Sequence, residues 1–424
     1  MVAFIALLVT ACSSTRYLMP TPYIYDGNNS AGFEMLSLPL RTSNIDLLYV
    51  TDRKPEPNDE HTFSYGYKRS LSMAFGSVMV LPGVAVNWNQ LVEASQTSNR
   101  LRKIKLSIGN IIEQGRYPKT PYPLLKDEEG LVRQDPASFI SFDTINSKFQ
   151  AELSRRIAMT PKKEVFIYIH GYNNSFADAV YTLAELWHFS GRETVPILYS
   201  WPAGRGGFSG YGYDRESGEF TIFHLKQFLQ SLAANPEIEK LHILAHSRGT
   251  DVILSALREL FIEATALGND PHSFYRIANL ILAAPDLDIE VVSQRLLAER
   301  ISLNIDNITI YTSSQDRAIQ LSGLLFDSIS RVGALVTNDQ SREDEFFRLM
   351  VEQLMILNNV NFIEMRGKTD FIGHGYFHNN PAVSSDLIMQ LRYGAPPGKE
   401  YGRPIEPSGP NSWIIADDDY KKPE

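Results

Sequence analysis

The feature that most restricts the fold of this chain is a regular alternation of short apolar runs with longer amphipathic stretches, from residue 147 to about residue 395. The short runs are typical of buried strands and the longer stretches of helices. Because parallel strands are joined by long crossovers, usually helices, the alternation predicts a mostly parallel sheet with helices on both faces. We expect strands at 164–169, 195–200, 241–245, 277–284, 308–312 and 360–365, and helices at 148–158, 176–190, 220–234, 250–267, 343–357 and 382–391.

Strand-like segments also precede this α/β core and predict a strand-rich extension of the sheet over residues 46–140. The clearest of them are 46–50, 77–81 and 103–112. Residues 113–138 are rich in proline, glycine and charge, so we expect a loop there.

The two ends of the chain are more polar than its middle. Residues 12–45 carry scattered Tyr, Pro, Asn and Ser and are expected to form a tether or a loosely packed lead-in. Residues 396–424 end in three aspartates and two lysines and are expected to form a solvated tail.

The first residues indicate export. Residues 2–11 are apolar but span only about half of the roughly 20 residues that a membrane helix needs, which favours a signal peptide over 1–11. Val9 to Cys12, followed by Ser13, resembles a bacterial lipobox. The resemblance implies lipidation of Cys12 and a membrane partner in the bacterial cell envelope, with the periplasmic face of the outer membrane favoured. No Lys or Arg precedes the run, so a cytosolic chain with an ordinary thiol stays open as the alternative.

Composition argues against several other classes. The net charge is −9 and no Lys/Arg run is longer than a pair, which disfavours nucleic acid as a partner. A single cysteine, Cys12, excludes an internal disulfide and a cysteine-rich zinc site. His242 and His246 are four residues apart, but on a strand that spacing is about 13 Å, too far for one metal ion. We therefore expect no metal and no cofactor. His188 and His224 fall on expected helices and are assigned to the surface or the core edge.

The most informative motif is Ala245-His246-Ser247-Arg248-Gly249, where an apolar strand passes directly into an amphipathic helix. It matches a nucleophile elbow, G-x-S-x-G, with Ala in the first place. Small residues on both sides of the apex keep strand and helix from colliding, and the hydroxyl is presented at the positive end of a helix. A plain helix-capping serine is the alternative. In its strand–turn–helix context, the motif predicts Ser247 as a nucleophile.

A second motif supports this interpretation. The expected strand 164–169 ends in His170-Gly171-Tyr172, and the glycine allows the backbone to turn sharply. In folds with a nucleophile elbow, the loop after the third strand supplies one oxyanion donor. The expected donors are the backbone N–H groups of Tyr172 and Arg248.

A serine nucleophile needs a base, and the fold places it late in the chain. Three histidines follow the elbow: His272, His374 and His378. His272 comes too early for the usual order. His374 lies in a loop between Gly373 and Gly375, just after the last expected strand of the core, and is the preferred base; His378 is the alternative.

The acid that orients the base is expected at a strand end. Asp316 follows the strand at 308–312 and is the first choice. Asp286 follows the preceding strand and is the second, with Asp288 close by. Either of these two could instead cap the amphipathic run 289–299.

Together these motifs resemble a bacterial α/β-hydrolase family of unknown physiological function, similar to esterases and lipases and often found as lipoproteins. The resemblance extends over residues 46–392 and implies the α/β-hydrolase fold and a triad of Ser247, Asp316 and His374. The matching stretches are Tyr49 to Arg53, Gly66 to Arg69, His170 to Asn173, Ser200 to Pro202, His246 to Gly249, Ala283 to Asp286, Ser314 to Arg317 and Gly373 to Tyr376.

The expected function is therefore hydrolysis of a small-molecule or lipid ester through an acyl-enzyme on Ser247, and thioesters or amides would use the same machinery. The alternative is a non-catalytic envelope protein that keeps the fold as a binding platform. The glycine-rich, aromatic stretch 201–219, with Phe208, Tyr211 and Tyr213, is interpreted either as a lid or acyl-binding wall or as a mobile surface loop.

Overall fold

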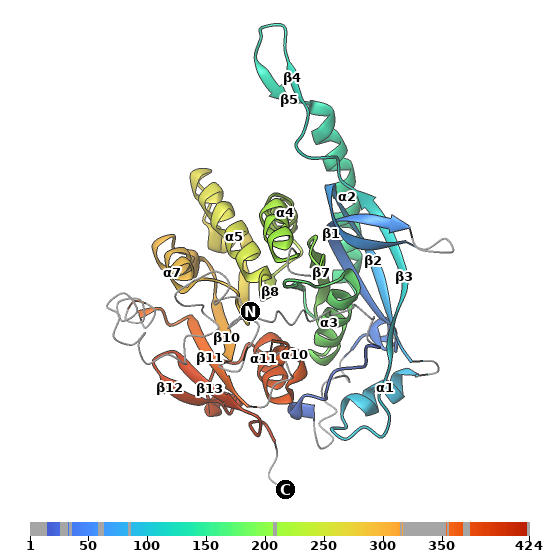
Figure 1. The fold of residues 1–424 in the computed structure, drawn as a ribbon, viewed down its shortest axis with the longest axis vertical. Helices are drawn as coiled ribbons and strands as arrows, with labels where there is room; N and C mark the ends of the chain where they lie inside the picture. Colours follow the sequence, from blue (N-terminus) through green and yellow to red (C-terminus); the bar gives the residue numbers. More distant parts are fainter. Residues whose placement is uncertain are drawn as a thin grey trace, which may run out of the picture.

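A computed structural model of the protein describes residues 15–25, 33, 36–57, 63–83, 86–206, 210–313, 316, 353, 356–367 and 374–421. Within these residues the main sheet has eleven strands in the order β12-β13-β11-β10-β9-β8-β6-β7-β1-β2-β3 (Figure 1). The strands are β1 (Ile45–Pro57), β2 (Phe63–Pro82), β3 (Leu106–Arg116), β6 (Glu164–Ile169), β7 (Val195–Ser200), β8 (Lys240–His246), β9 (Ile277–Ala283), β10 (Asn307–Ser313), β11 (Val360–Arg366), β12 (Glu406–Gly409) and β13 (Ser412–Ala416).

The central strands run parallel to one another. Every neighbouring pair from β13 across to β1 is parallel, whereas β2, β3 and β12 join their neighbours in antiparallel fashion. The mostly parallel sheet with helices on both faces, predicted from the alternating pattern, is confirmed, and so is the β-rich N-terminal extension, which continues the same sheet.

Helices cover both faces of this sheet because its central strands are apolar on both sides. In β6, Val165 and Ile167 pack into one hydrophobic cluster, and Phe166 and Tyr168 into another, as the twofold repeat of a strand requires. Helices α2, α4, α5 and α7 lie on the first face and α3, α10 and α11 on the second (Figure 1). The helices are α1 (Trp88–Ser95), α2 (Pro136–Ile157), α3 (Phe176–Phe189), α4 (Gly210–Ala233), α5 (Gly249–Ala266), α6 (Pro271–Tyr275), α7 (Ile289–Ser293), α10 (Tyr376–Asn379) and α11 (Pro381–Tyr393).

Part of the described lead-in packs against the body of the protein and so differs from the expected tether. Leu18 and Tyr25 are buried, and the Leu18 N–H donates to the Ile104 carbonyl at 2.8 Å. Arg16, which is partly exposed, forms an ion pair with the buried Glu185 of α3. The segment looked loose because its apolar residues follow no local period; their contacts are with distant strands and helices.

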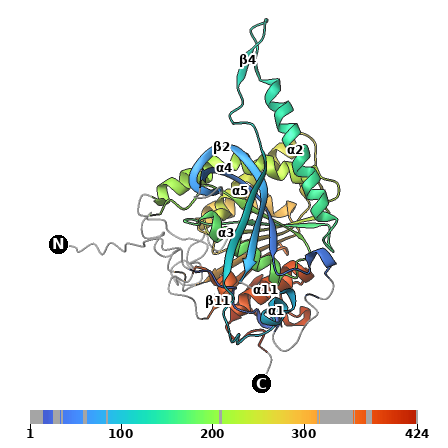
Figure 2. The same ribbon diagram turned by 90° about the vertical axis from the view of Figure 1, so that its right-hand side faces the viewer.

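The segment expected to be one loop, 113–138, contains the end of β3, a small hairpin and the start of α2. The hairpin strands are β4 (Leu124–Lys126) and β5 (Val132–Gln134). Asp135 caps α2 through the Ala137 N–H, and Pro136 occupies its first turn. Hairpin and helix together project from the body as an arm (Figures 1 and 2).

Two further segments are more ordered than expected. The glycine-rich stretch 201–219 is not one loop, because α4 already begins at Gly210. The expected solvated tail contributes β12 and β13 to the sheet. Three of the expectations fall outside the described residues. They are nearly all of the helix expected at 343–357, Phe208, and the whole signal and lipobox segment. No helix in the described part is long and apolar enough to span a bilayer.

Candidate active site

Ser247 lies at the apex of the turn from β8 to α5. Its backbone has a φ of +52°, the left-handed region that a non-glycine residue rarely adopts. The crowding explains the small neighbours: a Cβ on Gly249 would lie 2.5 Å from the His170 carbonyl oxygen. The turn is held by the Ser247 N–H, which donates to the Ala283 carbonyl at 2.9 Å, and by the Thr250 hydroxyl, which donates to the Ser247 carbonyl at 2.7 Å. The elbow geometry predicted from the sequence is therefore present.

The loop after β6 lies directly against this apex. A Cβ on Gly171 would be 2.6 Å from the Ser247 Cβ, so only glycine allows this approach. In the part of the chain that the structure describes, neither the Tyr172 N–H nor the Arg248 N–H has an acceptor. Two unpaired N–H groups beside a strained serine are suited to stabilise an oxyanion.

The expected base and acid are brought together. His374 Nδ1 lies 2.7 Å from Asp316 Oδ2; the Asp316 side chain is 1% exposed and that of His374 19%. Because the carboxylate accepts from Nδ1–H, the other ring nitrogen carries the lone pair that a general base uses. Asp316 follows β10 and His374 follows β11, so both reach the same edge of the sheet as the elbow.

His246, the residue before the nucleophile, connects this pair to the elbow. Its Nε2 is 3.2 Å from the His374 carbonyl oxygen, and the two ring centroids are 4.6 Å apart. Burial, followed by the nearby His374 charge, lowers the pKa of His246 well below its usual value. A neutral His246 therefore donates Nε2–H to that carbonyl and holds the loop that carries His374.

The side chains of the alternative residues have other partners. The Asp286 carboxylate accepts from the Tyr211 hydroxyl at 3.0 Å, and Asp288 caps α7 by accepting from the Glu290 N–H at 2.8 Å. His378 is buried in α10, where burial and then the Arg16 charge lower its pKa to about 3. The carboxylate that contacts His374 is thus that of Asp316.

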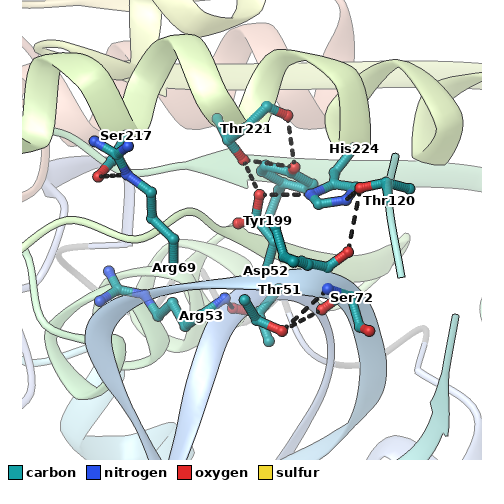
Figure 3. A network of polar contacts seen from close by, with 12 residues as sticks. Thr51, Asp52, Arg53, Arg69, Ser72, Thr120, Tyr199, Ser217, Thr221 and His224 are labelled. Atoms are coloured by element: carbon teal, nitrogen blue, oxygen red, sulfur yellow. Dashed lines mark hydrogen bonds and ion pairs between the residues drawn. The ribbon is translucent and has the colours of Figure 1, made fainter. Parts of the chain in front are cut away.

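A second constellation of hydroxyl, imidazole and carboxylate lies elsewhere in the molecule (Figure 3). Asp52 Oδ2 is 2.9 Å from His224 Nδ1, and His224 Nε2 is 2.8 Å from the Thr120 hydroxyl. All three side chains are buried, so this group joins β1, α4 and the segment after β3. The expectation that His224 and His188 lie at the surface or core edge is wrong, because both helices are enclosed by the extension.

Two buried charged residues next to the candidate site are missing from the sequence-based site prediction. Arg53 entered it only as part of a resembling stretch, and Asp214 did not enter it at all. Both contact the loops after β6 and β7. Neither has a local signature, because their partners are mostly backbone groups of other segments.

None of the groups of His, Cys, Asp and Glu in the described ranges has a metal-binding arrangement. His242 instead contacts Glu164 through Nε2 at 3.0 Å and Asn279 through Nδ1 at 2.8 Å.

Several solved structures share features with the chain at low identity. A predicted CIB-like hydrolase from Thermoplasma acidophilum is 14% identical, covers 54% of this chain and 86% of its own, and has a TM-score of 0.32. The Pyrobaculum calidifontis esterase is 12% identical, covers 59% of this chain and 92% of its own, and has a TM-score of 0.28. No curated protein matches the chain closely enough to count as a relative.

A family model gives the assignment. Residues 145–391, more than half of the 424 residues, match the model described as alpha/beta hydrolase of unknown function (DUF900). The matched region begins in α2, ends in α11 and includes Ser247, Asp316 and His374. The chain therefore belongs to this family of alpha/beta hydrolases of unknown function.

Proposed function

We propose that this protein hydrolyses carboxylic esters through an acyl-enzyme on Ser247, with His374 as general base and Asp316 as the acid that orients it. The observation that carries the proposal is the 2.7 Å contact of Asp316 with His374 Nδ1, on a loop that also touches the elbow residue next to Ser247. A carboxylate–imidazole pair beside a serine on a strained apex is the arrangement that activates a hydroxyl.

The chemistry follows from these positions. His374 Nε2 accepts the hydroxyl proton as Ser247 Oγ bonds to the ester carbonyl carbon, and the C=O electron pair moves to oxygen. The N–H groups of Tyr172 and Arg248 donate to that oxyanion. Collapse breaks the bond to the alkoxide, which takes the proton from His374. Water then repeats the sequence on the acyl-enzyme, releases the acid and regenerates Ser247.

An aromatic wall beside the site favours an ester with an apolar or planar group. The Tyr172 and Tyr211 rings lie 5.3 Å apart, and the Tyr211 hydroxyl is held by Asp286. Since Tyr211 lies in the first turn of α4, a helix carries this side of the wall; for 201–219 the sequence had left open a lid or acyl-binding wall and a mobile surface loop.

A fluorophosphonate probe tests the proposal, because it reacts only with an activated serine. We expect labelling of the wild-type protein and its loss in both Ser247→Ala and His374→Ala. His272→Ala is the matched control: this histidine is exposed, pairs with Asp306 at 2.7 Å, and its loss should leave labelling unchanged. A folded wild-type protein that takes no label contradicts the proposal and favours a non-catalytic binding platform.

We also propose that the protein is held at a bacterial membrane through lipidated Cys12. Cys12 lies outside the described residues, but it is only four positions before Arg16, which is packed against α3. Four residues span at most about 14 Å, so an anchor there would keep the catalytic domain close to the bilayer. Incorporation of labelled palmitate that is lost in Cys12→Ser is the expected result; unlabelled wild-type protein contradicts the anchor.

A further inference from the structure

Arg53 reaches the candidate active site from the N-terminal extension, outside the region that matches the family model. It is carried on β1, which pairs with β7 up to Thr51 and Ser200 and then continues past the end of β7. Arg53 therefore lies beside the loop that follows β7. Figure 3 shows Asp52 directed toward Thr221 and His224, whereas Arg53, the next residue, extends away from them.

The Arg53 guanidinium is buried, with 1% of the residue exposed, and all five of its N–H donors have an acceptor. None of the acceptors is a carboxylate, although burying an unpaired charge is costly. A buried arginine can hold several chain segments together, because its planar guanidinium presents five donors in fixed directions. The acceptors are Ser200 Oγ at 2.8 Å from Nε, the Gly66 and Ala203 carbonyls at 3.1 and 2.6 Å from Nη1, and His170 Nε2 and the Asn174 carbonyl at 3.0 and 2.8 Å from Nη2.

The contact with His170 fixes the residue that begins the oxyanion loop. Because the guanidinium donates to Nε2, that nitrogen carries the lone pair, and Nδ1–H donates to the Gly171 carbonyl at 3.0 Å. The imidazole stacks on Trp201, with ring centroids 5.2 Å apart, and the Trp201 Nε1–H donates to the His170 carbonyl at 2.7 Å. Burial, and next the Arg53 charge, hold the pKa of His170 well below its usual value, so the ring stays neutral.

Asp214, on α4, binds the same two loops, but it accepts from their backbone N–H groups, whereas Arg53 donates to their carbonyls. Its Oδ2 accepts from the Asn173 N–H at 3.0 Å and from the Gly204 N–H at 3.1 Å. Arg53 donates to the carbonyls of the residues next to these, Asn174 and Ala203. A cation and an anion thus clamp both loops: they bind the carbonyl and the N–H of the single peptide group between Ala203 and Gly204, and nearby backbone groups of Asn173 and Asn174.

We propose that Arg53 and Asp214 are positioning residues that fix the Tyr172 backbone N–H at the point where the oxyanion forms. The inference rests on the proposed ester hydrolysis. An oxyanion donor acts only within about 2.7–3.1 Å of the developing charge, and a misplacement of about 1 Å can cost 10²-fold in rate. Neither residue touches the reacting atoms; both act through the loop that presents Tyr172.

The test compares Arg53→Met, Arg53→Lys and Asp214→Asn with Arg192→Met. Arg192 is the matched control because it is equally buried and donates to the Leu40 and Thr42 carbonyls, but it precedes β7 and so lies at the opposite edge of the sheet. The concentration of active serine in each variant is measured with the fluorophosphonate probe, and kcat is expressed per active serine. The readouts are kcat and KM on a p-nitrophenyl ester and the inhibition constant of a trifluoromethyl ketone, whose adduct carries an oxyanion.

We expect Arg53→Met to lower kcat per active serine roughly 10²-fold with little change in KM, and to weaken the ketone by a similar factor. Arg53→Lys keeps the charge but has only three donors, so it should retain part of the rate. Arg192→Met should lower the Tm and leave kcat per active serine nearly unchanged. An Arg53→Met kcat that falls no further than that of Arg192→Met overturns the inference. If Arg53→Met does not fold, Asp214→Asn decides the question by the same readouts.

Hydrogen–deuterium exchange separates this inference from the proposed function. A wild-type protein that neither takes the probe nor hydrolyses esters contradicts the proposed function. In that case the clamp is supported if Arg53→Met or Asp214→Asn speeds exchange of the Asn173 and Gly204 amides relative to Arg192→Met. Unchanged exchange at both amides overturns it.

Discussion

Two of the aspartate–histidine pairs among the described residues have nearly the same local geometry but different surroundings. In both, a carboxylate contacts Nδ1, at 2.7 Å for Asp316–His374 and at 2.9 Å for Asp52–His224. The first pair is partly exposed at a sheet edge beside a serine with positive φ and two unpaired N–H groups. The second pair is enclosed and contacts a threonine whose hydroxyl also lies 3.2 Å from the Leu71 carbonyl.

The difference shows that the residue types of a triad do not by themselves make a catalytic site. The proposed reaction needs a hydroxyl with an open approach and donors for the developing negative charge. The buried group offers neither, and its hydrogen bonds instead join the extension to α4. Each prediction below changes one member of the comparison.

Removing the imidazoles should give the largest contrast. We expect His374→Ala to lower kcat by about 10⁵- to 10⁶-fold, because loss of a proton acceptor stops serine attack. His224→Ala should instead destabilise the fold by roughly 3 kcal/mol, since it leaves a buried carboxylate unpaired, while kcat per active serine changes little. Ester kinetics and urea unfolding measure the two effects. A catalytic loss of the same size in both variants would contradict the distinction.

Neutralising the carboxylates sharpens the same contrast. Asp316→Asn should reduce kcat by about 10⁴-fold, because the amide favours the wrong tautomer of His374. Asp52→Asn should lower the free energy of unfolding by about 1–3 kcal/mol and leave kcat per active serine within a few-fold. If the effects on kcat were reversed between the two variants, the base would have been assigned to the wrong imidazole.

Gly171→Ala tests the expected oxyanion donors, the backbone N–H groups beside Ser247, which have no counterpart at the buried pair. The added Cβ would lie 2.6 Å from the Ser247 Cβ and 3.0 Å from the His246 carbonyl, so the loop must move. We expect kcat to fall about 10²-fold through the displaced Tyr172 N–H. Gly212→Ala is a suitable control, because a Cβ there meets nothing within 4 Å. Equal kinetics for the two variants would show that the loop does not supply a donor.

The burial of the His378 imidazole should make the free energy of unfolding depend on pH. The pKa of His378 is lowered to about 3 in the folded protein, so between that value and its ordinary pKa the unfolded chain binds a proton that the folded chain does not. The contribution of His378 to the free energy of unfolding is therefore complete above about pH 6.5 and is lost as the pH falls toward 3. At pH 5, about 2 kcal/mol of that free energy has been lost. Urea unfolding at pH 7.5 and 5 should show a smaller difference in His378→Phe than in the wild type. An equal difference in both would mean that His378 is not buried as a neutral ring.

The smallest effect concerns the two hydroxyls. Thr120→Val removes one buried hydrogen-bonding group and should cost about 1 kcal/mol of stability, with fluorophosphonate labelling unchanged. Slower labelling at an unchanged Tm would indicate that Thr120 belongs to a reactive site.

Local signals made much of this architecture predictable. The elbow, its small neighbours and the strands around it follow from short-range sterics and apolar period, so Ala245 to Gly249 could be interpreted directly. Asp316 and His374 were predictable as strand-end residues because parallel strands bring their carboxyl ends to one edge.

Long-range contacts explain what the sequence did not reveal. The packing of Leu18 and Tyr25 depends on distant elements, and so does the burial of His188 and His224. Arg53 binds mostly backbone groups of other segments, which leave no residue pattern to recognise. The helical start of α4 at Gly210 is also set by tertiary contacts: Arg69 of β2 donates to Ser217 Oγ and to the Tyr213 carbonyl, at 2.9 and 3.2 Å.

Mass spectrometry of the protein after reaction with a fluorophosphonate, followed by mapping of the modified peptide, tests the central claim most directly. One adduct per chain, on the peptide that contains Ser247 and not on the one that contains Thr120, is the result expected. A folded protein with no adduct, or with its adduct on another hydroxyl, would contradict the assignment of Ser247 as the nucleophile.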